Sequence, residues 1–259
     1  MNKINLTDCT FIIPLKVDSY DREQNFLFCI NYLTKNFDTK IIITETSDNN
    51  SLILNKKYRE LINKNNILLI EKDSEKVFHR TKYLNEMLNM VKTSVTINYD
   101  IDVFLPKKNY SKARDLILID NFDLVYPYTT KSWYQYKVPQ AYRDIILKDN
   151  LQDINFNKLI KHTTEHGHLQ FFNTASYKQG YGENEDFISY GPEDKERYFR
   201  FNKLGFKITD LKDGEYVFHL EHYRGLDSGH HDNYENNEKI WSKIQSFSDS
   251  EFLNYYKQK

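Results

Sequence analysis

The segment SVTINYDID, residues 94–102, joins an apolar run to a pair of aspartates. The β-branched and apolar side chains of Ser94–Tyr99 predict a buried strand. Three upstream segments share this composition, and the stretches between them have the apolar spacing of helices. The other strands are Thr10–Pro14, Lys40–Thr46 and Ile67–Glu71, and the helices are Arg22–Asn36, Leu52–Asn63 and Arg80–Val91. This alternation predicts an α/β fold with a mostly parallel sheet and helices on both faces.

The second half of the chain has a less regular pattern. It contains three short strand candidates, two helix candidates, one polar segment expected to be a mobile loop, and a closing helix. The strand candidates are Phe122–Pro127, Lys207–Leu211 and Tyr216–Leu220, and the helix candidates are Gln140–Leu147 and Glu193–Leu204. The polar segment is Gly225–Asn237, and the closing helix is Glu238–Tyr256. No repeat or linker separates the halves, so we expect one domain over residues 1–259, with a regular half of about 1–105 and a variable half of about 106–259.

Charge and composition limit the classes of partner. The 259 residues carry 36 Lys and Arg against 37 Asp and Glu, a net charge of −1. No basic block stands out, so nucleic acid is not an expected partner. The two cysteines, Cys9 and Cys29, lack metal-ligand spacing. Because no apolar signal segment or long apolar run is present, we expect a cytoplasmic protein without a transmembrane segment, for which peripheral membrane association stays open.

The parallel sheet predicts where a ligand binds. Ligands of such sheets lie beyond the carboxyl ends of the strands, which here are Pro14–Asp18, Glu45–Asp48 and Asp100–Asp102. Oxygen ligands suit a hard cation such as Mn²⁺ or Mg²⁺, and such a cation can neutralise a diphosphate. The alternative for an Asp-x-Asp is an ordinary polar turn after a strand.

Further motifs accompany the aspartates in a fixed order. They are FHRTKYLN at 78–85, GYG at 180–182, YGPEDKE at 190–196 and VFHLEH at 217–222. Over residues 10–222 this combination resembles the galactosyltransferase-like branch of the GT-A glycosyltransferases. The resemblance implies a GT-A fold, a UDP-sugar donor, Mn²⁺ or Mg²⁺, and transfer of galactose, N-acetylgalactosamine or glucose to a carbohydrate acceptor in glycan or surface polysaccharide synthesis. It also implies that the regular half binds the nucleotide and the variable half the acceptor.

The resemblance assigns nucleotide contacts to the first half. The segment Pro14-Leu15-Lys16-Val17-Asp18 resembles the family's Pro-x-Arg-x-Arg, followed by an Arg and an Asn as in bacterial members. Phe78 matches the residue along the uracil, and Arg80 the one that contacts the nucleotide. Asp100 and Asp102 match the Asp-x-Asp, whose second member binds metal. The resemblance thus implies nucleotide contacts for Pro14, Lys16, Asp18, Arg22, Glu45, Phe78, Arg80, Asp100 and Tyr190, and metal ligation for Asp102 and Asp100.

The resemblance also assigns the chemistry to the second half. Gly191–Asp194 is similar to the family's Gly-Gly-Glu-Asp, although Pro192 replaces the second Gly and Tyr190 stands where Trp is frequent. An acceptor hydroxyl needs a base, for which Asp194 is the candidate, with Glu193 as an acceptor or donor contact. Both could instead be ordinary acids at a helix start.

Two histidines are candidate metal ligands on the late strand. By the resemblance His219 is the third ligand and His222 the second choice, or a diphosphate contact. The alternative for each is a core histidine. Another cluster, His162, His166 and His168, has no spacing that imposes zinc geometry, and the resemblance places Gly167–Asn173 along the donor sugar.

Two other functional classes stay open. A metal-dependent nucleotidyltransferase also uses paired aspartates, but it would need a glycine-rich phosphate loop, and Pro14–Asn25 contains no glycine. A non-catalytic carbohydrate- or nucleotide-binding module would be expected to lack the Asp pair or the Glu-Asp pair, and this sequence has both.

Overall fold

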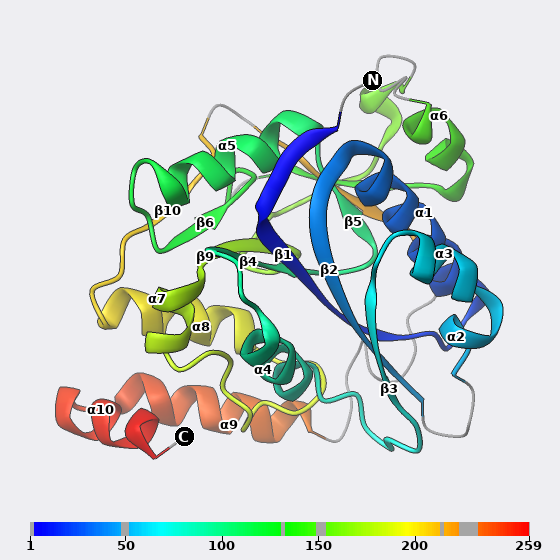
Figure 1. The fold of residues 1–259 in the computed structure, drawn as a ribbon. Coiled ribbons are helices and arrows are strands. Elements are labelled where there is room, and N and C mark those ends of the chain that lie inside the picture. Colours follow the sequence, from blue (N-terminus) through cyan, green and yellow to red (C-terminus); the bar gives the residue numbers. More distant parts are fainter. Residues whose placement is uncertain are drawn as a thin grey trace.

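A seven-stranded sheet forms the centre of the molecule (Figure 1). The computed structural model describes residues 3–47, 52–130, 133–148, 154–212, 215–222 and 233–258. The strand order is β10-β6-β9-β4-β1-β2-β3. In chain order the strands are β1 (Ile4–Lys16), β2 (Phe37–Thr46), β3 (Leu68–Lys72), β4 (Val95–Tyr99), β6 (Leu124–Tyr126), β9 (Leu169–Asn173) and β10 (Ile208–Asp210). Strands β1 to β4 pair in parallel, as do β6 and β10, which confirms the predicted mostly parallel α/β sheet.

Helices cover both faces of this sheet. Figure 1 shows α5 on one side and α4, α7 and α8 on the other. Every residue of β4 is buried, as a strand covered on both faces must be. The helices around the sheet are α1 (Tyr20–Asn36), α2 (Leu54–Lys57), α3 (Arg59–Lys64), α4 (Arg80–Met90), α5 (Lys107–Leu118), α6 (Arg143–Leu147), α7 (Thr174–Gln179) and α8 (Glu193–Lys203). One hydrophobic core runs from Leu6 to Leu220 and therefore joins the two halves of the chain.

The variable half adds two features that the sequence did not predict. Strand β9 lies antiparallel between β4 and β6, so the parallel order is interrupted there. A second sheet has the order β5-β11-β7-β8. Its strands are β5 (Val103–Phe104), β7 (Gln135–Val138), β8 (Lys161–His162) and β11 (Val217–Leu220). In this sheet β11 pairs antiparallel with β5, and His219 lies opposite Val103, next to Asp102.

Three predicted helices are divided in the structure. The range Leu52–Asn63 contains α2 and α3, which meet at Tyr58. The range Gln140–Leu147 contains a 3₁₀ helix, η1 (Gln140–Tyr142), followed by α6. A further 3₁₀ helix, η3, covers Phe156–Lys158. The expected closing helix is two helices, α9 (Tyr234–Ser246) and α10 (Asp249–Lys257). The break has a local cause: Ser248 and Glu251 form a capping box that starts α10.

The loop predicted for Gly225–Asn237 is wrong at its end, because Tyr234–Asn237 belongs to α9. Residues 225–232 of that prediction lie outside the described residues, as does Asp48 of the expected ligand-binding rim. None of the described helices is long and apolar enough to cross a membrane.

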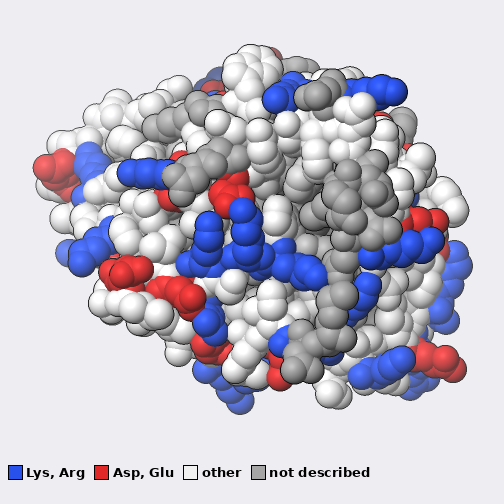
Figure 2. All heavy atoms as spheres, turned by 90° about the horizontal axis from the view of Figure 1, so that it is seen from above, with Lys and Arg blue, Asp and Glu red and all other residues white. Residues whose placement is uncertain are grey.

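The face seen in Figure 2 carries a band of lysine and arginine side chains. Basic residues of α5, which lies on this side in Figure 1, have acidic partners. Lys108 and Lys112 lie 2.9 and 3.3 Å from Glu215, and Arg114 lies 2.6 Å from Asp115. These ion pairs offset part of the positive charge of this helix.

Candidate active site

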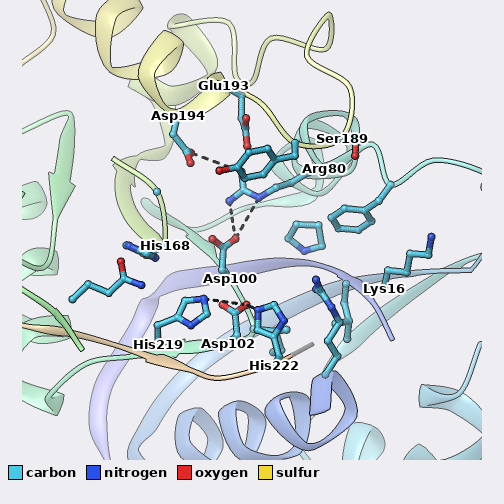
Figure 3. Close-up of a pocket in the computed structure, with 18 residues that line it drawn as sticks. Lys16, Arg80, Asp100, Asp102, His168, Ser189, Glu193, Asp194, His219 and His222 are labelled. Atoms are coloured by element: carbon cyan, nitrogen blue, oxygen red, sulfur yellow. Dashed lines mark hydrogen bonds and ion pairs between the residues drawn. The ribbon is translucent and has the colours of Figure 1, made fainter. Parts of the chain in front are cut away.

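A pocket of about 320 Å³ opens beyond the ends of β1 and β4 (Figure 3). Its walls come from both sheets, from the start of α4 and from the start of α8. Of the residues predicted for the site, twelve line this pocket: Pro14, Lys16, Arg22, Phe78, Arg80, Asp100, Asp102, Tyr190, Glu193, Asp194, His219 and His222. Segments far apart in the sequence therefore meet at one place.

Asp102, His219 and His222 form the one group of potential metal ligands found among the described residues. The Oδ2 atom of Asp102 lies 2.9 Å from Nε2 of His222 and 3.7 Å from Nε2 of His219. The candidate ligand atoms all lie within 4.8 Å of one another. The pairing of β11 with β5 produces this arrangement, and the Leu220 N–H donates to the Asp102 carbonyl at 2.7 Å.

The electrostatics of this group favour an ionised carboxylate. Burial opposes the charge of Asp102, but His219 and His222 hold its pKa well below the ordinary value. A carboxylate and two imidazoles together can hold a divalent ion. The two imidazole nitrogens suit a transition metal better than Mg²⁺, which prefers oxygen ligands. The residues present therefore fit the predicted metal, with Mn²⁺ favoured over Mg²⁺.

Asp100 has a different partner. Its Oδ1 atom accepts hydrogen bonds from Nη2 and Nε of Arg80, at 2.8 and 3.3 Å. The side chain is thus held by a guanidinium and does not belong to the three-residue group, so its metal ligation stays a prediction. Arg80 also lies 4.0 Å from Asp194, measured from Nη1 to Oδ1. Figure 3 shows Arg80 and Asp100 between the group of potential metal ligands and the two acids of α8.

Glu193 and Asp194 begin α8 and differ in their surroundings. Asp194 is ion-paired with Arg197, which is fully buried and also donates to Glu183 at 2.9 Å. Oε2 of Glu193 is buried and has no hydrogen-bond partner among the described residues. Burial and the charge of Asp194 raise the pKa of Glu193 to about 8. Burial also raises the pKa of Asp194, but the charges of Arg197 and Arg80 oppose this effect.

The two neighbouring acids therefore suit two roles at neutral pH. A protonated Glu193 can donate a hydrogen bond, whereas the arginines beside Asp194 favour its carboxylate form, which can accept a proton. Gly167 faces this pair closely, since a Cβ atom there would lie 2.9 Å from Oδ2 of Asp194. A side chain at position 167 would obstruct the carboxylate.

Two predicted nucleotide contacts do not line the pocket. Glu45 is buried, and its carboxylate accepts the backbone N–H groups of Ile53 and Leu54, at 2.8 and 3.1 Å. It therefore caps the start of α2. Asp18 instead forms an ion pair with Arg22 at 3.1 Å.

The structure adds lining residues that the sequence prediction missed. These are Gln135 and Ser189. Leu15, Ile101 and His168 also line the pocket, and each lies in a segment that the sequence analysis expected at the ligand site. His168 and Ser189 have left-handed backbone angles, φ 67° and 63°, a strain that often accompanies functional sites. Burial and the charge of His219 lower the pKa of His168, which favours the neutral imidazole. Of the expected donor-sugar segment, Gly167 and His168 line the pocket, whereas Leu169–Asn173 forms β9.

Comparison with known proteins gives structural likenesses only. No protein-family model and no curated protein sequence matches this chain. TarS from S. aureus, solved with UDP-GlcNAc, is similar with a TM-score of 0.56 and 16% identity, over 95% of this chain and 71% of that one. The mannosyltransferase PcManGT from Pyrobaculum calidifontis, solved with GDP-Man and Mn²⁺, has a TM-score of 0.51 and 13% identity, over 83% of this chain.

This chain spans only 56% of the length of the mannosyltransferase chain. Sequence identities this low show the arrangement of the backbone and leave activity to be argued from the site. Together with the mostly parallel seven-stranded sheet, these likenesses show that the protein has the GT-A glycosyltransferase fold.

Proposed function

We propose that this protein is a metal-dependent glycosyltransferase that moves a hexose or N-acetylhexosamine from a UDP-sugar to a carbohydrate acceptor, with inversion at the anomeric carbon. One observation carries the proposal: within one pocket, the group Asp102, His219 and His222 faces the acids Glu193 and Asp194 across Arg80. The first group suits a metal-bound diphosphate, and the second suits activation of a hydroxyl.

The leaving group is expected on the metal-ligating side. When bound there, a divalent cation would neutralise the charge that develops on the departing diphosphate. Lys16 and Arg22 also line this pocket, so their positive charges can contact phosphate oxygens. Phe78 lines the pocket and packs against Tyr83 with ring centroids 5.7 Å apart, which fixes the ring as a surface for the uracil base.

The acceptor is expected on the side of Asp194. In a single displacement, the acceptor oxygen bonds to the anomeric carbon as the bond from that carbon to the diphosphate breaks. The acceptor proton passes to Asp194. Glu193, protonated at neutral pH, donates a hydrogen bond to a sugar hydroxyl, and the arginines keep Asp194 anionic until the reaction. Positioning and charge stabilisation supply most of the rate.

The alternatives have less support in the structure. Nucleotidyl transfer would require binding of a triphosphate, but the pocket residues Pro14–Lys16 end a strand and offer no glycine-rich loop. A binding module without activity would have no need for a buried acid of raised pKa beside an ionised one. We place the activity in the cytoplasm, in glycan or surface polysaccharide synthesis.

The test is release of UDP from UDP-galactose, UDP-N-acetylgalactosamine, UDP-glucose and UDP-N-acetylglucosamine, with and without Mn²⁺. GDP-mannose serves as the comparison donor. We expect Mn²⁺-dependent release from at least one UDP-sugar, accelerated by a carbohydrate acceptor. Release of pyrophosphate from a nucleoside triphosphate and a sugar phosphate, with no UDP release, would instead support the nucleotidyltransferase. Metal-dependent UDP binding without turnover would support the binding module.

A further inference from the structure

Two more cavities continue the pocket beyond Asp194. The nearer one, of about 340 Å³, shares Gly167, His168, Tyr190, Glu193 and Asp194 with the pocket. The farther one, of about 520 Å³, shares Thr163, Glu165, His166 and Lys195 with the nearer cavity. Because each cavity shares lining residues with the next, the three cavities adjoin in a row, and we describe them together as one groove. It leads from the two acids, along α8, to Trp241 of α9, and Figure 1 shows these helices side by side.

The groove combines aromatic rings with polar side chains. Tyr190 stacks on Tyr234 with ring centroids 6.2 Å apart at the nearer cavity. At the farther cavity, Tyr198 stacks on His166 at 3.8 Å, and Trp241 meets Phe199 edge-on at 5.5 Å. Rigid aromatic faces pack against the C–H faces of sugar rings, and nearby polar groups bind the hydroxyls.

The polar side chains that line the groove do not favour a strongly charged ligand. Lys195 and Glu165 form an exposed ion pair at 3.4 Å on the wall shared by the two cavities. Asn202 adds an amide at the farther cavity, and Glu238 a carboxyl at the nearer one. Opposite charges and an amide match the donors and acceptors of sugar hydroxyls. They give no concentrated positive charge for a polyanion.

We propose that this groove is an extended acceptor site that holds an oligosaccharide chain of at least three sugar units, with its far end against Trp241 and Tyr198. The inference rests on the proposed function, in which the reacting hydroxyl lies at Asp194. With the donor on the side of Phe78 and the metal-ligating group, the rest of the acceptor extends away from them, into the groove. One sugar unit at Asp194 can occupy at most the nearer cavity and leaves the farther one, of about 520 Å³, unfilled, so a monosaccharide would use only part of the site.

Tryptophan fluorescence tests occupancy without turnover. The chain has two tryptophans, Trp133 and Trp241. Trp133 is 64% exposed and lines none of the three cavities of the groove. In a Trp133→Phe protein, emission therefore reports Trp241 alone. The probes are ladders of one to six units built from glucose, galactose, N-acetylglucosamine or N-acetylgalactosamine, added with UDP and Mn²⁺.

We expect a saturable change in Trp241 emission from members of at least one ladder with three or more units, and none from its monosaccharide. Equal responses at all lengths would overturn the proposal, as would no response from any ladder. A response to mixed unstructured peptides and to no ladder would assign the groove to a peptide, and would overturn it equally.

A kinetic split provides the second test. In Trp241→Ala, the KM for the longest active ladder member should rise about three- to tenfold, as expected for one aromatic contact, with a smaller change for the shortest active member. Trp133→Ala is the matched control, with both KM values unchanged. Equal KM changes at all lengths would overturn the extended site. If metal-dependent UDP release is present but acceptor length has no effect, only this inference fails; if wild type releases no UDP from any donor, the proposed function fails first.

Discussion

The two charged walls of the pocket are built in different ways. The metal wall, Asp102, His219 and His222, comes from two strand ends that are more than a hundred residues apart in the sequence and meet through the pairing of β5 and β11. The carboxylate wall, Glu193 and Asp194, is two consecutive residues of one helix turn. The metal wall depends on long-range pairing, whereas the carboxylate wall depends on where a single helix begins.

The walls also differ in how their charge is balanced. Two arginines, Arg197 and Arg80, face the carboxylate wall from within the protein. The metal wall has imidazoles beside its carboxylate, and imidazoles can exchange a proton for a metal ion. The metal wall is therefore suited to reversible binding, and the carboxylate wall to proton transfer by a fixed group. Changes in the two walls should affect different measurements.

The largest effect is expected from Asp194→Asn. The substitution keeps the size of the side chain but removes its basicity, so turnover should fall by about two to four orders of magnitude. The affinity for UDP and Mn²⁺ should stay within about twofold, because the metal wall is intact. Turnover and UDP calorimetry on the same protein measure both.

The control is Asp249→Asn, the same change in the first turn of α10, where the side chain is 93% exposed. It should alter neither quantity. If Asp194→Asn changes stability by only a few tenths of a kcal/mol and leaves turnover intact, Asp194 is an ordinary acid at a helix start.

Removing the buried arginine behind the carboxylate wall should come next. Arg197→Met leaves Glu183 buried without its cation, which should lower the free energy of unfolding by about 3–5 kcal/mol. The turnover rate per folded molecule should also fall, because Asp194 loses the partner that positions it. Urea unfolding gives the first quantity, and turnover per folded molecule, with its pH profile, gives the second.

Arg200→Met is the matched control for this effect. Arg200 lies on the same helix and is equally buried, with Glu196 as its partner at 2.7 Å, but it does not line the pocket. It should cost similar stability and leave turnover per folded molecule unchanged. Equal turnover losses in both variants would show that Arg197 acts only through stability.

A smaller effect is expected on the metal wall. Asp102→Ala removes the carboxylate of the three-residue group, so the Mn²⁺-dependent part of UDP affinity should fall by about 10- to 100-fold. Calorimetry with and without Mn²⁺ measures it. Asp115→Ala, on α5, is the control. Equal UDP affinity in Asp102→Ala and wild type would remove the metal wall from the donor site.

Local sequence patterns predicted the regular half and the strand ends. The strand before Asp100 and Asp102 could be recognised from its own composition, without knowing which strands it pairs with. By contrast, the antiparallel course of β9 depends on long-range pairing that a short apolar run cannot reveal. Gln135 and Ser189 enter the pocket from a second sheet and a loop, neither of which has a local signal. These residues could not be found by pattern.

Two other features have more specific causes. An acid at a strand end can face a ligand or cap the following helix, and the side-chain direction decides. Glu45 caps α2 in this structure, and its nucleotide contact stays a prediction. The break between α9 and α10 could have been predicted, because Ser248 and Glu251 have the spacing of a capping box. The resemblance, rather than periodicity, suggested both histidines of the metal wall.

The smallest effect concerns the proton on Glu193. Its pKa of about 8 in the folded protein lies above the ordinary value of 4.5. Between these values the folded state holds a proton that the unfolded state has lost, so stability decreases as pH rises from about 4.5 to 8. Glu193→Gln has no such proton. Its melting temperature should match wild type near pH 5 and exceed it at pH 8 by on the order of a few degrees. Turnover at pH 7 should persist, because the Gln amide still donates a hydrogen bond.

Parallel melting curves across this range would mean that Glu193 is ionised throughout. Loss of turnover in Glu193→Gln, with activity kept in Asp194→Asn, would move the base by one residue along α8 and leave the division between the two walls in place.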